Sequence, residues 1–162
     1  LALFDVDRSC ILDPLTQPLP FTPFKDFTER SINEINLYST EMSSALYSID
    51  RVSASANMNN RLSEAIVEAY KSTNGAPISF ELMLKCYQSR MKDANNDDSI
   101  SSVLKQLVNA HIFESEDKVS LIDDSYIIKM DGYPKDGPIA KAIVYFLMSK
   151  LNNIYELWIN KQ

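Results

Sequence analysis

The stretch that decides the fold is Ser99-Ile-Ser-Ser-Val-Leu-Lys-Gln-Leu-Val-Asn-Ala-His-Ile-Phe-Glu-Ser-Glu-Asp-Lys-Val-Ser-Leu-Ile122. In its first half, Ile, Val and Leu recur at spacings of three and four residues, which predicts a helix that buries one face. Asp98 or Ser99 can cap that helix, because short polar side chains accept from the free N–H groups of the first turn. Residues 112–113 and 119–122 then read as two short strands around a charged tip. A helix followed by a β-hairpin is therefore expected.

Two more helices are predicted immediately before this stretch. Residues 61–72 carry apolar side chains on one helical face, and Gly75 and Pro77 end that helix in a turn. Ser79 can cap the second helix. The inward-facing residues of this second helix are expected to be Leu82, Met83, Cys86 and Tyr87. The predicted order is thus three helices and then a hairpin.

This order resembles the winged helix, the helix-turn-helix variant in which a β-hairpin follows the third helix. The resemblance covers residues 61–122 and implies a mainly α fold with a winged-helix domain at residues 61–131. It is similar to winged helices in subunits of eukaryotic replication, chromatin and transcription complexes. The resemblance therefore implies an intracellular, nuclear protein that works inside a larger assembly.

The N-terminal part is predicted to be extended. Residues 1–24 include four prolines between Pro14 and Pro23, which remove backbone donors and fix φ, so a connector is expected there. Its apolar residues suit packing along a neighbouring surface. The sequence begins with Leu1 rather than Met, and we expect it to be a piece of a longer protein.

Helices are predicted on both sides of the winged-helix domain. Residues 25–52 show helical spacing, and residues 53–60 are small and polar, which is typical of a linker. Residues 138–161 are expected to form a long C-terminal helix with Pro138 at its first position. The apolar arc of that helix is wider than one small core can cover.

Composition excludes several classes of protein. The 162 residues carry 16 Lys and Arg against 22 Asp and Glu, for a net charge of −6, and 45% are hydrophobic, which is enough for a core. No apolar run is long enough to span a membrane. Two cysteines and one histidine are too few for a disulfide framework or a structural zinc site without carboxylates, so no metal or other cofactor is expected. The few cysteines indicate a reduced, intracellular environment.

The predicted third helix is the place where a winged helix would contact DNA. The candidate nucleic-acid contacts are Ser102, Lys105, Gln106 and Asn109 on this helix and Lys118 at the wing tip. Residues 56–131 nevertheless have a net charge of −4, and neutralisation of phosphates supplies most non-specific affinity for DNA. The charge favours a protein-interaction domain, with direct but weak DNA binding as the alternative.

The C-terminal helix offers the candidate protein contacts. Aromatic and Met side chains supply large contact areas at modest entropic cost. The predicted partner-binding residues are Tyr145, Met148, Tyr155, Trp158 and Ile159. The other interpretation is that all five pack on the predicted helix at residues 26–50. Partners are expected to be protein subunits of a larger complex, and a homodimer is possible on the same face.

A remote alternative is an enzyme. The opening residues, Leu-Ala-Leu-Phe-Asp-Val-Asp, resemble the first motif of haloacid dehalogenase-type phosphatases, which implies Asp5 as nucleophile and Asp7 as general acid or base. Asp123 and Asp124 would correspond to the later pair that holds magnesium. However, Arg8 stands where that family usually has glycine, and the chain lacks repeated strand-helix units. The main prediction is therefore a non-enzymatic assembly domain.

Overall fold

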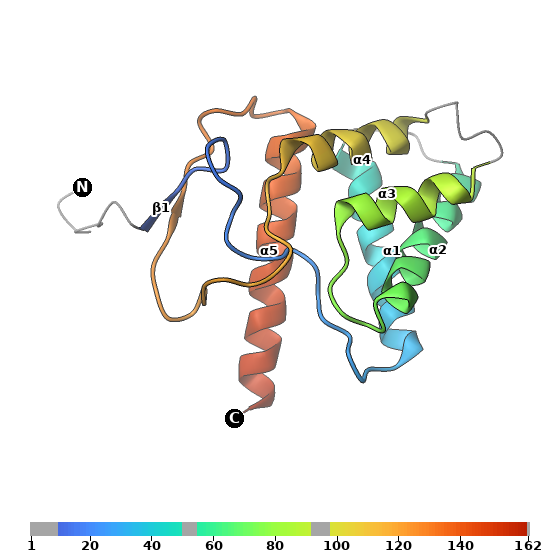
Figure 1. Ribbon diagram of the computed structural model, residues 1–162, viewed down its shortest axis with the longest axis horizontal. Helices are drawn as coiled ribbons and strands as arrows, with labels where there is room; N and C mark the ends of the chain where they lie inside the picture. Colours follow the sequence, from blue (N-terminus) through green and yellow to red (C-terminus); the bar gives the residue numbers. More distant parts are fainter. Residues whose placement is uncertain (1–9, 50–54, 92–97, 162) are drawn as a thin grey trace.

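The computed structural model describes residues 10–49, 55–91 and 98–161, and these ranges are mainly helical (Figure 1). The elements are, in order, β1 (Ile11–Leu12), α1 (Ile32–Ile49), α2 (Ala56–Ser72), α3 (Phe80–Ser89), α4 (Ser99–Ala110), β2 (Ile127–Ile128) and α5 (Pro138–Asn160). Each of α1 to α4 packs against the next helix along the chain, and α5 packs against α1 and α4. The mainly α fold class predicted from the sequence is confirmed.

Helices α3, α4 and α5 begin where the sequence indicates. The Ser79 side chain accepts from the Leu82 N–H at 3.1 Å, and Asp98 accepts from the Ser101 N–H at 2.8 Å. Pro138 is the first residue of α5, where its missing N–H costs no hydrogen bond. Local capping chemistry therefore sets these three boundaries.

Helices α1 and α2 begin at other residues than expected. Ser31 and Glu34 form a reciprocal capping box at the start of α1, so the helix begins at Ile32 and not at residue 25. Ser55 accepts from the Met58 N–H at 3.3 Å and caps α2, which therefore includes most of the expected linker at residues 53–60. Residues 50–54 lie outside the described ranges.

The segment between β1 and α1, residues 13–31, contains the four closely spaced prolines and is called the strap. Leu19, Phe21, Phe24 and Phe27 are at most 3% exposed, although Leu15 is open to solvent. The strap crosses between the α1–α4 bundle and α5 (Figure 1). Proline removes donors but leaves apolar side chains free to pack, so the segment joins the core without forming a helix.

The strands pair differently from the predicted hairpin. Phe113 forms a parallel bridge with Leu19, and the Leu19 N–H donates to the Ile112 carbonyl at 2.6 Å. Strand β1 pairs in parallel with β2, whereas residues 119–122 form no strand and Ile122 lies exposed in a turn. The strap supplies Leu19, which is buried, as the partner of Phe113. In the described ranges, pairings with the N-terminal segment thus replace the expected hairpin.

Gly75 is required by the contact between the strap and the end of α2. Its φ is +88°, the Phe27 N–H donates to its carbonyl at 2.6 Å, and an added Cβ would lie 2.5 Å from the Phe27 carbonyl oxygen. We expect Gly75→Ala to lower the free energy of unfolding by about 1–3 kcal/mol, measured by chemical denaturation.

Asn74→Gly is the control, because Asn74 also has a positive φ, of 53°, but already tolerates it. This variant should leave stability unchanged or slightly raised. Equal stability of Gly75→Ala and the wild type would show that this turn does not constrain the fold.

Candidate protein-interaction surface

Helix α5 has an anchored first half and an open second half. Its buried residues, Ala140, Ala142, Ile143, Phe146 and Lys150, all precede Leu151. From Leu151 to Lys161 every residue is exposed or only partly buried. In Figure 1 the last turns of α5 run away from α2, α3 and α4 toward the C-terminus. The helix therefore extends beyond the core that holds it.

Four of the five predicted partner-binding residues are open to solvent. Met148, Tyr155, Trp158 and Ile159 are 62%, 58%, 52% and 46% exposed, and the rings of Tyr155 and Trp158 stack with centroids 6.3 Å apart. Tyr145 instead is partly buried and packs against Phe146 at 5.0 Å. The interpretation that all five pack on the preceding helical segment therefore does not hold.

Sequence reasoning missed two members of the outward face. Val144 and Leu151 are 55% and 42% exposed, and neither was among the predicted partner-binding residues. Together with three of the predicted residues they form a run in which apolar side chains recur every four and three residues. We call this run the α5 seam, and its members are Val144, Met148, Leu151, Tyr155 and Trp158. Such spacing is typical of a helix that packs along another helix.

The α5 seam carries no charge. Between Val144 and Ile159 the only charged residues are Lys150 and Glu156. Lys150 is buried and Glu156 lies 3.5 Å from the Lys25 Nζ. Both charged side chains therefore point toward the strap. The outward side of α5 is left uncharged.

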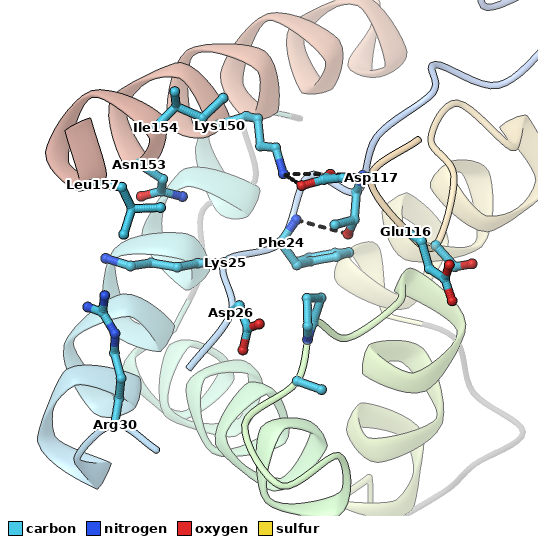
Figure 2. A pocket seen from close by; sticks show the side chains of 14 residues that line it. Phe24, Lys25, Asp26, Arg30, Glu116, Asp117, Lys150, Asn153, Ile154 and Leu157 are labelled. Carbon is cyan, nitrogen blue, oxygen red and sulfur yellow. Dashed lines mark hydrogen bonds and ion pairs between the residues drawn. The ribbon is translucent and has the colours of Figure 1, made fainter. Parts of the chain in front are cut away.

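An ion pair fixes the direction of α5. The Lys150 Nζ donates to both carboxylate oxygens of Asp117 at 2.7 and 2.8 Å (Figure 2). Asp117 also accepts from the Thr22 N–H at 3.0 Å. Lys150 is 8% exposed, so its charge is nearly removed from water. The pair joins α5, the strap and the loop after α4. It holds the helix so that the seam faces outward.

A pocket beside this ion pair is lined by charged side chains of both signs. Its volume is about 500 Å³, and three cations (Lys25, Arg30, Lys150) and three carboxylates (Asp26, Glu116, Asp117) line it. Hydrogen bonds from the Thr28 hydroxyl and then its N–H lower the pKa of Asp26. The opposite charges balance each other, so the pocket offers no net charge to a ligand.

A second, apolar pocket lies at the N-terminal end of the seam. It has a volume of about 450 Å³ and is lined by Met130, Tyr133, Lys135, Ala140, Lys141, Val144 and Tyr145. Burial raises the pKa of Tyr133 and of Tyr145 above the ordinary value of a phenol. Val144 belongs both to this pocket and to the seam, which makes the two features continuous.

The predicted nucleic-acid contacts are only partly brought together. Ser102, Gln106 and Asn109 are exposed on α4, Lys105 on the same helix is half-buried, and Lys118 lies on the following loop. The Lys118 Nζ is 3.2 Å from a carboxylate oxygen of Glu114. The surface next to α4 is therefore mixed in charge.

The residues of the phosphatase resemblance do not form a site in the described ranges. Asp123 and Asp124 are exposed in a turn and do not follow a strand, and Asp5 and Asp7 lie outside the described residues. Among residues 10–49, 55–91 and 98–161, no three His, Cys, Asp or Glu side chains are grouped to hold a metal ion. No helix in these ranges has the length and hydropathy to span a membrane.

Comparisons with protein-family models, with curated proteins and with solved structures find no match to this chain. Its function is therefore inferred from the surface itself. The feature that stands out is the uncharged seam on a helix that the core anchors at one end only.

We expect Asp117→Asn to lower the free energy of unfolding by about 1–3 kcal/mol, because Lys150 then keeps a buried charge without its carboxylate. Chemical denaturation measures the loss. The double variant Asp117→Asn/Lys150→Met should recover part of the lost stability, because no unpaired charge then stays buried.

Glu116→Gln is the matched control, because Glu116 is an exposed carboxylate next to Asp117. This variant should change stability by less than about 0.5 kcal/mol. If Asp117→Asn is equally mild, the ion pair does not hold α5 in place.

Proposed function

We propose that this protein is a non-enzymatic assembly module that binds another protein through the outward face of α5. The observation that carries the proposal is the exposure of Met148, Tyr155 and Trp158 on one side of an anchored helix. Large aromatic and Met side chains in contact with water are costly to keep and are enriched at interfaces. Their burial against a partner supplies the binding free energy.

The geometry of α5 supports this role. Phe146 and Lys150 attach the first half of the helix to the core, so the second half is presented in a fixed direction. Tyr155 and Trp158 already stack on each other, which reduces the entropy that they lose on binding. A preorganised face of this kind suits a stable complex.

The helices α2, α3 and α4 support the winged-helix proposal for this part of the chain. They follow one another along the chain, and each packs against the next. The strand pairing of Phe113 with Leu19 would be a departure from a standard wing. On this proposal the protein belongs to a nuclear complex, as winged-helix subunits of chromosomal assemblies do.

Direct DNA binding is supported less well. The loop after α4 carries Glu114, Glu116 and Asp117, and Lys118 is close to Glu114. A surface with these carboxylates repels phosphates and offers little counterion release. Contact with DNA inside a larger complex would need cations from another subunit.

We expect the double variant Tyr155→Ala/Trp158→Ala to lose the partner proteins that co-purify with the full chain from its own cells. Truncation of a central aromatic costs about 2 kcal/mol or more, roughly a thirtyfold loss of affinity. The free energy of unfolding should change little, because both side chains are half-exposed.

Leu37→Ala is the matched control, since Leu37 is a large apolar side chain that is 64% exposed but belongs to α1 and not to α5. It should retain every partner. Partners that stay bound to the double variant would contradict the proposal, and so would unfolding of that variant, because the two aromatic residues would then belong to the core.

A further inference from the structure

We propose that the partner on the α5 seam is a second copy of this chain, paired antiparallel, with Trp158 of each copy in the apolar pocket of the other. The proposal rests on the assembly role and names the occupant of the same surface. Three features of the described residues carry it: the spacing of the seam, its lack of charge and the position of the pocket.

The spacing of the seam fits a helix as its occupant. Val144, Met148, Leu151, Tyr155 and Trp158 alternate steps of four and three residues, so they face one side over two heptads. A helix that carries the same spacing can place its side chains between them. The α5 helix of a second copy meets that condition.

The flanks of the seam do not oppose pairing of identical chains. Charged residues beside a seam set partner choice in helix pairs, and like charges there prevent self-association. Between Val144 and Ile159 the flanking positions are instead uncharged, and they are Tyr145, Leu147, Asn152, Ile154 and Ile159. Lys141 and Lys161 lie just beyond the two ends of the seam. Two copies therefore meet without electrostatic repulsion between these two ends.

The position of the pocket selects the antiparallel orientation. With Leu151 on the two-fold axis, Val144 of one copy lies opposite Trp158 of the other, and Met148 lies opposite Tyr155. Since Val144 lines the pocket of about 450 Å³, the indole of Trp158 arrives at its mouth. In a parallel pair Trp158 would meet Trp158, and the pocket would stay empty.

The chemistry of the pocket suits an indole. Met130, Tyr133 and Tyr145 supply apolar and aromatic walls, and Lys135 and Lys141 also line the pocket. A lysine near an indole face adds a cation–π attraction of about 0.5–2 kcal/mol. The two-fold symmetry forms this contact twice, as in isologous dimers.

The available area is sufficient for a dimer. Val144, Met148, Leu151, Tyr155, Trp158 and Ile159 are 42–62% exposed. Large apolar side chains carry on the order of 200 Å² each, so burying the open half of six buries about 1,200 Å² in a pair, above the roughly 1,000 Å² that a specific interface needs.

The first test is light scattering after size-exclusion chromatography of the full chain over a wide dilution series. We expect a dimer that dissociates on dilution, a monomer for Trp158→Ala, and at least about tenfold weaker dimerisation for Tyr133→Ala, which removes a pocket wall. Leu37→Ala should dimerise like the wild type. A dimer that Trp158→Ala leaves intact would overturn the proposal.

The second test is disulfide cross-linking in a variant in which Cys10 and Cys86, the two native cysteines, are replaced by Ala. Leu151→Cys should cross-link with itself across the axis. Val144→Cys should not cross-link alone, but should cross-link when mixed with Trp158→Cys. Self-cross-linking of Val144→Cys would show a parallel pair and would overturn the antiparallel arrangement.

A chain that is monomeric at every dilution overturns self-pairing alone. The assembly role then still stands or falls on the co-purification of the Tyr155→Ala/Trp158→Ala variant. Retention of all partners by that variant would remove the assembly role, whatever the oligomeric state. The two failures are therefore distinguishable.

Discussion

Contacts among five phenylalanine rings hold the separate parts of the chain together. Phe21 and Phe24 belong to the strap, Phe80 to the start of α3, Phe113 to the loop that follows α4, and Phe146 to α5. Phe24, Phe80 and Phe146 meet one another edge to face at 4.9 to 5.7 Å, and Phe113 lies 6.0 Å from Phe146 and 5.7 Å from Phe21. Each such pair is worth about 0.5–1.5 kcal/mol beyond the burial of its area.

The outward face of α5 follows from this cluster. Because Phe146 and Ile143 point into the core, the seam residues Val144, Met148 and Leu151 must point away from it. Lys150 reaches Asp117 from the inner side and gives the helix its direction. Beyond that ion pair α5 has no fully buried residue in the described ranges, and its outward side remains open to a partner.

Local chemistry made the helices predictable. Apolar spacing and capping residues such as Ser79, Asp98 and Pro138 act within a few residues, and these helix starts agree with the structure. The partner of Phe113 was not predictable, because Leu19 is distant in the sequence and proline-rich segments show no periodicity. The ion pair of Asp117 with Lys150 was not predictable either, because the two residues are 33 positions apart in the sequence. On α5, spacing identified the apolar residues, but only the packing of Phe146 shows which of them face outward.

The central claim, that the end of α5 is an open contact surface and not part of the core, is tested most directly by fluorescence of Trp158, the only tryptophan in the sequence. At a dilution where the chain is monomeric, we expect an emission maximum typical of indole in water and strong quenching by acrylamide. An emission that is already shifted to the blue and shielded from acrylamide at every dilution would contradict the account, because Trp158 would then be packed inside its own chain.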